Sequence, residues 1–189
     1  RGTVMADHVI VCAGLWGRLI AEMVGEDLPV MPVDHPLTFF GPYNEFEGTG
    51  KEIGYPLLRD QGNSAYMRDT GDPKTTEGGQ IEWGYYEQHN PRMCHPRELL
   101  EKHEARLSPS QRDLDMEQIL EPLERAIELT PILGELGYNE SHSFNGLLQV
   151  SAGGGASCGE SQNVRGLWYC VAIWVKDGPA YGKLIADWM

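Results

Sequence analysis

The sequence predicts an α+β fold, with a strand–glycine–helix unit near each end of the chain and an antiparallel sheet with flanking helices between them. Residues 167–175 form a nearly continuous apolar run, typical of a strand covered on both faces, and glycines and a helical repeat follow it. Residues 8–14 begin a similar unit near the other end. Backbone N–H groups at such a turn, together with the helix dipole, favour anions and electron-rich cofactor rings.

The composition is that of an acidic globular chain. Its 189 residues include 28 acidic and 15 basic side chains, for a formal net charge of -13, and this length suits one domain, or one domain with part of another. The negative charge argues against a nucleic-acid partner or an anionic membrane surface. No apolar run approaches the roughly 20 residues that span a bilayer. The chain begins without a methionine and ends inside a predicted helix, so we expect a piece of a longer protein.

The four cysteines, Cys12, Cys94, Cys158 and Cys170, have no C-x-x-C spacing. Cys12 and Cys170 lie inside apolar runs. This usage predicts reduced, mostly buried thiols in a cytoplasmic protein and no disulfide framework.

In chain order, the first strand is followed by a predicted helix over residues 15–25, where four apolar residues share one face. Prolines punctuate an extended segment over 30–40, whose aromatic end predicts a strand. A polar loop comes next. Three short strands then follow, with turn-rich links that predict antiparallel hairpins, over residues 55–59, 65–69 and 80–86.

The second half predicts more helix. A proline suits the first turn of a short helix over residues 96–103. Residues 113–133 carry apolar side chains at three- and four-residue steps and predict a longer helix, interrupted only by prolines. Residues 144–150 predict a strand, and a loop rich in glycine, serine and alanine, 151–159, leads to the last strand.

A G-x-S-x-G sequence at residues 155–159 raises the alternative of a serine hydrolase with Ser157 as nucleophile. A nucleophile elbow needs a strand before the serine and a helix directly after it, because that turn exposes the hydroxyl and forms the oxyanion hole. Residues 160–165 form a polar segment that leads into another strand. We therefore expect Ser157 not to be a nucleophile.

Histidine and cysteine also cluster between residues 89 and 103. The residues His89, Cys94, His95 and His103 fit none of the short paired spacings of structural zinc sites. The acidic segment 44–52 lacks the regular oxygen ligands of an EF-hand. We therefore expect polar surface histidines in the first place, a solvated acidic surface in the second, and no metal site in either.

Tyr66 and Arg68 alternate with apolar residues on a predicted hairpin strand, so both should face the same side of the sheet. Trp83, Tyr85 and Tyr86 belong to the next strand. A face with these side chains could hold a small carboxylate through the guanidinium donors, and its rings could surround an amine. The structural alternative is an arginine that pairs with a nearby acid, and spacing alone favours that alternative.

Several different short motifs lie along nearly the whole chain and follow one another in the order known from one family. They are residues 6–17, which include A-G-L-W, and 28–35, 56–60, 66–68, 144–146, 159–160 and 166–175. Together they resemble the C-terminal part of the FAD-dependent amine oxidoreductases of the D-amino-acid-oxidase/glycine-oxidase fold, in the dimethylglycine and sarcosine dehydrogenase branch. The resemblance implies partial Rossmann-like FAD-domain elements at residues 1–28 and 151–189, and a substrate domain at 29–150.

The resemblance also implies chemistry and site residues. The intact protein would oxidise the C–N bond of a small N-methylated amino acid, of the dimethylglycine or sarcosine type, by hydride transfer to flavin N5. Tyr66 and Arg68 would bind this substrate. Cofactor binding would fall to two glycine-bearing turns, through Ala13, Gly14, Trp16, Lys176, Asp177, Gly178 and Gly182.

The chain departs from the family pattern in three places. It has no G-x-G-x-x-G phosphate loop, residues 151–154 replace the T-P-D-G of the family, and Leu37 stands where close relatives have an aromatic residue. We expect FAD to bind the intact protein with the help of a missing N-terminal portion, and the fragment alone to be inactive. A non-catalytic small-molecule binding or interaction module remains an alternative.

Overall fold

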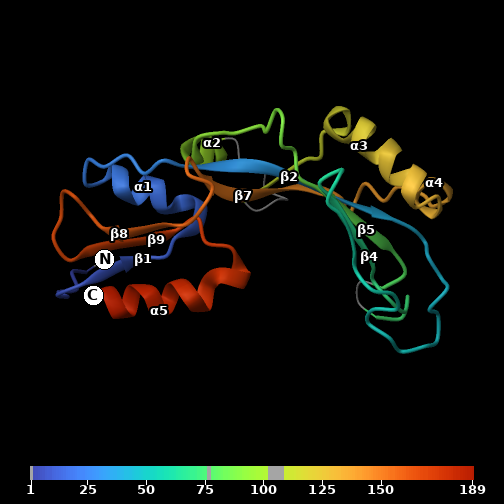
Figure 1. Cartoon of the computed structure of the whole chain (residues 1–189), viewed down its shortest axis with the longest axis horizontal. Coiled ribbons are helices and arrows are strands. Elements are labelled where there is room, and N and C mark those ends of the chain that lie inside the picture. Colours follow the sequence, from blue (N-terminus) through green and yellow to red (C-terminus); the bar gives the residue numbers. More distant parts are fainter. Residues whose placement is uncertain (1, 76–77, 102–108) are drawn as a thin grey trace. The chain divides into compact units, whose positions relative to one another are not determined.

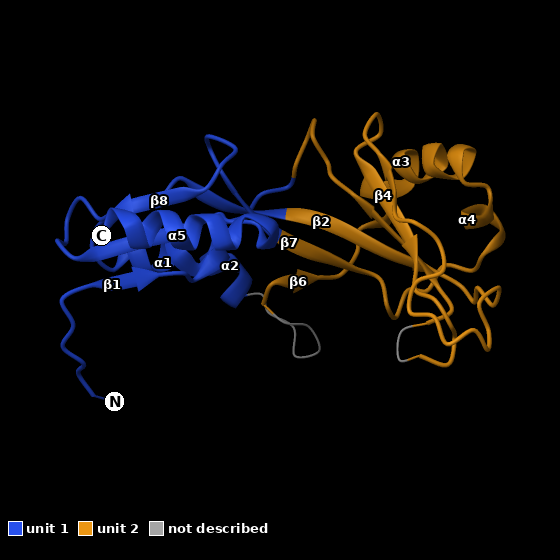
Figure 2. Cartoon of the chain, turned by 60° about the horizontal axis from the view of Figure 1, so that its bottom comes forward, with its two compact units in different colours: residues 1–33, 92–104, 148–189 blue, residues 34–91, 105–147 orange. Residues whose placement is uncertain are grey.

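The computed structural model describes residues 2–75, 78–101 and 109–189, and the chain divides into two compact units (Figure 2). Unit 1, blue in the figure, comprises residues 1–33, 92–104 and 148–189, and unit 2, orange, comprises 34–91 and 105–147. The predicted substrate domain, residues 29–150, therefore includes residues of both units. Within the described ranges, no helix has the length and apolar character needed to cross a membrane.

Unit 1 contains a three-stranded sheet in the order β1-β9-β8, formed by β1 (Val9–Val11), β9 (Leu167–Val171) and β8 (Ser157–Glu160). β1 and β9 run parallel, whereas β8 and β9 are antiparallel. The short helix η1 (Gly14–Trp16) and α1 (Gly17–Glu22) follow β1, and η2 (Val175–Asp177) and α5 (Gly178–Trp188) follow β9. The two predicted strand–turn–helix units are therefore present.

Helices cover both faces of this sheet, with α1 on one side and α5 on the other (Figure 1). Ala21 of α1 packs with Val11 and Tyr169. A Cβ atom at Gly17 would lie 2.6 Å from Cγ1 of Val171, so the helix can approach the sheet this closely only with glycine at that position. On the α5 side, the rings of Trp188 and Trp168 pack edge to face, with 5.6 Å between the ring centroids.

Two details of unit 1 differ from the sequence prediction. β9 ends at Val171, because Val171 is its last residue paired with β8, and Ala172 then turns the chain with a left-handed φ of 56°. β8 lies where a loop was predicted, since its Ser-Cys-Gly-Glu sequence has low strand propensity and only the pairing with β9 makes it a strand. The short helix α2 (Pro96–Glu101) also belongs to unit 1, and the predicted end of this helix at His103 lies outside the described residues.

Unit 2 is built on a six-stranded sheet in the order β3-β4-β5-β2-β7-β6. The predicted hairpin strands are confirmed as antiparallel neighbours, and the long extended segment is a strand over its full length. The strands are β3 (Leu58–Asp60), β4 (Ala65–Asp69), β5 (Ile81–Tyr85), β2 (Val30–Phe40), β7 (Phe144–Ser151) and β6 (Gln111–Arg112). The unit boundaries fall inside β2 and β7.

One face of the unit 2 sheet is covered by α3 (Met116–Leu129) and α4 (Ile132–Glu135). Asp115 caps α3, where its carboxylate accepts the backbone N–H of Glu117 at 3.0 Å. Ile119 and Leu133 of these helices form the core together with Trp83 and Met67 of the sheet. The opposite face of the sheet is therefore the one available for a site.

The acidic loop before β3 is held by two carboxylates. Asp69 accepts the backbone N–H groups of Gly54 at 2.7 Å and Tyr55 at 2.8 Å, and Asp72 accepts that of Gly50 at 2.7 Å. The backbone donors of Lys74 and Gly50 hold the pKa of Asp72 below its usual value. These carboxylates fix the loop to the sheet through hydrogen bonds.

Candidate active site

The helix-free face of the unit 2 sheet gathers residues from four neighbouring strands. The register sets Arg59 of β3 opposite Tyr66 of β4, Tyr66 opposite Gly84 of β5, and Gly84 opposite Leu37 of β2. Residues directly opposite each other in antiparallel strands point to the same face. A Cβ atom at Gly84 would lie 2.2 Å from Cζ of Tyr66, so the glycine leaves room for the tyrosine ring to lie across β5.

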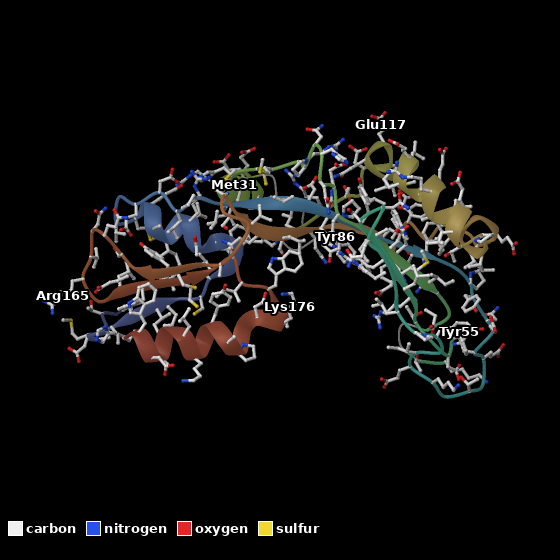
Figure 3. All side chains as sticks on the ribbon, viewed as in Figure 1. Met31, Tyr55, Tyr86, Glu117, Arg165 and Lys176 are labelled. Carbon is white, nitrogen blue, oxygen red and sulfur yellow. The ribbon has the colours of Figure 1, made fainter. Side chains whose placement is uncertain are left out.

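Four side chains meet on this face: His35, Arg59, Tyr66 and Tyr86, named here the His35 cluster. Nε2 of His35 and the hydroxyl oxygen of Tyr66 are 2.9 Å apart and share a hydrogen bond. The centroid of the His35 ring also lies 4.3 Å from the centroid of the ring of Tyr86, which is labelled in Figure 3. The guanidinium of Arg59 lies over the Tyr86 ring at 4.7 Å and over the Tyr66 ring at 5.9 Å.

The cluster combines two neutral hydrogen-bonding groups with one positive charge. Burial, reinforced by the charge of Arg59, lowers the pKa of His35 to about 4. Burial raises the pKa of Tyr66 above its usual range. At neutral pH both groups are therefore uncharged, and Arg59 carries the positive charge of the cluster. This combination suits an anionic ligand group beside a neutral hydrogen-bonding one.

Arg68, the predicted carboxylate ligand, faces the same side as Tyr66 but is already paired. Its Nε and a terminal nitrogen donate to the two carboxylate oxygens of Glu82 at 2.7 and 3.0 Å. Glu82 is only 12% exposed, so this bidentate pair is well shielded from water. The geometry matches the structural alternative for Arg68, and its role in substrate binding stays a prediction.

Arg59 has no such partner. Its side chain is exposed, and it forms no ion pair with any residue that the structure describes. Its guanidinium is held over two aromatic rings and leaves its donors available for a ligand. Arg59 therefore meets the requirement for a carboxylate anchor better than Arg68 does.

Trp83 and Tyr85 do not join the site, although the sequence suggested a shared aromatic face. They pair with Met67 and Ala65 on the core side of the sheet, and Trp83 is fully buried. The sequence reasoning missed His35 and Arg59 as site residues. For His35 a signal was available, because it is a titratable residue inside a mostly apolar strand.

The second functional region is an edge of the unit 1 sheet. Because β1 and β9 run parallel, their carboxyl ends meet at one edge, from which η1 and η2 start. Of the predicted cofactor residues, Ala13, Gly14 and Trp16 lie at the first turn. Gly14 has a φ of 53°, and a Cβ atom there would meet no atom within 4 Å, so backbone at this turn is open to a ligand.

The second turn borders a cavity of about 290 Å³ whose lining includes Gly154, Gly155, Trp174, Lys176 and Tyr181. Lys176, labelled in Figure 3, and Asp177 belong to η2, and Gly178 begins α5. Gly182 lies inside α5, so the predicted loop through Gly182 is too long, because the helix starts four residues earlier. Glycine-lined space beside a helix start and an aromatic ring fits the ring system of a flavin nucleotide.

Ser157 has none of the geometry of a hydrolase nucleophile. It lies in β8, which leads through a turn into β9, whereas an elbow requires a helix directly after the serine. The serine hydrolase alternative is therefore rejected.

Two residues of the segment after Cys94 contact Glu22 of α1 through polar side-chain atoms. His95 Nε2 and a terminal nitrogen of Arg97 each lie 2.7 Å from a carboxylate oxygen of Glu22. Among the described residues, no group of three or more histidine, cysteine or acidic side chains is placed to hold a metal ion. His103 of the candidate set lies outside those residues.

The fold and both regions define a flavin-binding fold with an antiparallel sheet domain, and comparison with known proteins agrees. Residues 1–188 match the model of the DAO family, FAD dependent oxidoreductase, and the chain belongs to this family. Mitochondrial dimethylglycine dehydrogenases of Rattus norvegicus and Homo sapiens are 25% and 23% identical over 191 residues. They match all of this chain, which covers 21% of their own length.

Solved structures of the same fold include two oxidases. Glycine oxidase from Geobacillus kaustophilus superposes with a TM-score of 0.63 at 18% identity, over 98% of this chain and 42% of that one. Iminodiacetate oxidase from Chelativorans sp. BNC1 gives 0.62 at 19% identity, over 97% and 42%. The predicted fold class and the family resemblance are thus confirmed, and the family uses FAD.

Proposed function

We propose that the intact protein oxidises the C–N bond of a small N-methylated amino acid, of the dimethylglycine or sarcosine type, with FAD as the hydride acceptor. The family, the two dimethylglycine dehydrogenases and the fold of the amino-acid oxidases support this reaction class. The observation that carries the substrate assignment is the His35 cluster, where an unpaired guanidinium lies beside a neutral histidine–tyrosine pair.

Arg59 would bind the substrate carboxylate. Its planar fork can donate two parallel hydrogen bonds to a carboxylate, and the rings of Tyr66 and Tyr86 hold the fork in place. A bound carboxylate would also neutralise the charge that contributes to the lowered pKa of His35. Substrate binding is therefore expected to make His35 a better proton acceptor.

Tyr66 and His35 would accept the amine proton. Hydride can leave the carbon next to nitrogen only when the nitrogen lone pair is free, so a bound ammonium group must first lose its proton. Tyr66 can take that proton on its hydroxyl oxygen while its own proton passes to Nε2 of His35, across the 2.9 Å hydrogen bond.

FAD, when bound, supplies the acceptor for two electrons and one proton as hydride. In this chain, the open backbone at Gly14 and the glycine-lined cavity bounded by Trp174 and Lys176 would hold it. A negative charge on the reduced cofactor would be favoured by the N-terminus of α5.

The experiment is anaerobic flavin reduction in the intact protein. Mixing it with dimethylglycine or sarcosine should bleach the flavin absorbance in a saturable manner, and N,N,N-trimethylglycine, which has no nitrogen lone pair, should leave it unchanged. An intact, flavin-loaded protein that no N-methylated amino acid reduces would contradict the proposed function.

We further propose that residues 1–189 alone neither retain FAD tightly nor turn over, because the chain has no G-x-G-x-x-G phosphate loop. Purification of this fragment with a stoichiometric flavin spectrum would overturn this proposal. The cytoplasmic location stays a prediction.

A further inference from the structure

Three cysteines lie in one row across the unit 1 sheet. Cys158 of β8 pairs directly with Cys170 of β9. On the other side of β9, the parallel register ends with Val11 opposite Tyr169, and Cys12 directly follows β1 while Cys170 is the next residue of β9. The side chains of Cys12 and Cys170 share a hydrogen bond. Cys12 after the end of β1, Cys170 on β9 and Cys158 on β8 are named here the cysteine row.

The central and outer thiols of the row are in contact. The Sγ atoms of Cys158 and Cys170 are 3.8 Å apart and share a hydrogen bond. Directly opposed residues of antiparallel strands have Cα atoms about 4.5–5.5 Å apart, which lies within the roughly 4.4–6.8 Å that a disulfide spans. Side-chain rotation alone can therefore bring the two sulfur atoms to bonding distance.

The three thiols differ in access. Cys158 and Cys170 are half-buried and Cys12 is exposed, so the prediction of mostly buried thiols is wrong for Cys12. Cys12 lies in an apolar run of the sequence, but β1 ends one residue before it, so Cys12 is not inside the sheet.

Burial, with hydrogen bonds to Cys158 and Cys12, raises the pKa of the Cys170 thiol to about 12, and burial also raises the pKa of the Cys158 thiol. Few thiolates therefore form at the buried pair, and a direct attack on an oxidant is slow there.

We propose that Cys158 and Cys170 are an oxidative modification site, which a small disulfide oxidant converts to a disulfide through the exposed thiol of Cys12. The Cys12 thiolate attacks one sulfur of the oxidant, so the S–S bond of the oxidant breaks and its first thiol leaves with the proton of Cys12. Cys170, which is in hydrogen-bond contact with Cys12, then loses its proton and attacks the Cys12 sulfur, and that proton leaves with the second thiol. Cys158 finally loses its proton and attacks the Cys170 sulfur, forming the Cys158–Cys170 bond, and the released Cys12 sulfur takes up the proton and returns to the thiol form.

The electrons and atoms balance. Two protein thiols lose two electrons and two protons in total, and the oxidant disulfide gains both and becomes two small thiols. The product bond would join β8 to β9 two residues from Ala156 and from Ala172, which line the unit 1 cavity. The modification site therefore lies in unit 1, near the proposed cofactor edge of the same unit.

Peptide mapping of the intact, folded protein tests this site. After incubation with oxidised glutathione, rapid alkylation and trypsin digestion, we expect a cross-linked pair of peptides 126–165 and 166–176, which contain Cys158 and Cys170. Peptide 2–18, with Cys12, should be recovered alkylated. Recovery of alkylated Cys158 and Cys170, with glutathione attached only at Cys12, would overturn the proposal.

Two variants test the relay. Cys158→Ala should trap the intermediate, so that peptides 2–18 and 166–176 are cross-linked instead. Cys12→Ala should slow formation of the Cys158–Cys170 bond about tenfold or more, because the exposed thiolate is lost. Cys94→Ala, at a buried thiol outside the row, is the matched control and should oxidise at the wild-type rate. A Cys12→Ala protein that oxidises as fast as the control would exclude the relay through Cys12.

Discussion

The open face of the unit 2 sheet carries two arginines, which lie in neighbouring rows of directly opposed residues across the strands. One arginine is paired with an acid and the other is not. In one row Arg68 lies opposite Glu82, whose carboxylate takes two of its donors. In the other row the residue of β5 is Gly84, and Arg59 lies over aromatic rings and pairs with no acid among the described residues. Arg68 is thus bound to the acid directly opposite it, whereas the residue directly opposite Arg59 is Tyr66, whose ring leaves the guanidinium donors available.

The largest expected effect concerns stability and pH. The pKa of His35 falls from an unfolded value near 6.5 to about 4 in the folded protein, so the unfolded state binds more protons between these values. Stability contributed by neutral His35 is fully present above pH 6.5 and is lost as the pH falls towards 4, by on the order of 3 kcal/mol.

His35→Gln should remove this part of the pH dependence in urea unfolding of the intact protein. His89→Gln, at an exposed histidine outside the cluster, is the control and should keep the wild-type slope. Equal slopes in His35→Gln and wild-type protein would mean that His35 is not held neutral by the fold.

The next effect separates the two arginines in catalysis. Arg59→Met should lower kcat/KM for dimethylglycine about 100-fold, because a charge-assisted pair of hydrogen bonds to the carboxylate is lost. Arg68→Met should change kcat/KM by only about threefold and should instead destabilise the fold, since Glu82 would be left without its partner. Steady-state kinetics and urea unfolding of both variants measure the two outcomes, and the reversed pattern would restore Arg68 as the anchor.

Gly84→Ala tests the contribution of the close contact between Gly84 and the Tyr66 ring. The added methyl group would overlap the Tyr66 ring and displace it from His35, so we expect kcat/KM to fall about 30-fold, or about 2 kcal/mol. Gly62→Ala, at a turn where the nearest neighbour of the new methyl lies 3.6 Å away, should retain activity. An unaffected Gly84→Ala enzyme would show that the position of Tyr66 does not matter.

Tyr66→Phe should have the smallest effect. It removes one hydroxyl and its hydrogen bond to His35, which is worth about 1 kcal/mol, or roughly fivefold in kcat/KM. Tyr55→Phe removes a hydroxyl from the loop outside the cluster and serves as the control. A pre-steady-state measurement of flavin reduction places the loss in the chemical step, and no loss there would exclude the proton relay through Tyr66.

The cofactor edge was easier to predict than the substrate face, for a physical reason. A strand, a glycine turn and a helix are consecutive in sequence, so the turns at Gly14 and Gly178 could be located from local patterns. The His35 cluster depends on the register of four strands, and its residues lie between positions 35 and 86. The alternation of side chains along a strand predicted that Tyr66 and Arg68 share a face of the sheet. The pairing of Arg68 with Glu82 could not be predicted without the register between β4 and β5.

The central claim is that the unpaired Arg59 holds the substrate carboxylate. The most direct measurement compares kcat/KM for dimethylglycine with that for trimethylamine, which keeps the tertiary amine and lacks the carboxylate. The preference for dimethylglycine should fall about 100-fold in Arg59→Met and stay at the wild-type value in Arg68→Met. An Arg59→Met enzyme that keeps the full preference, alongside an Arg68→Met enzyme that loses it, would contradict the claim.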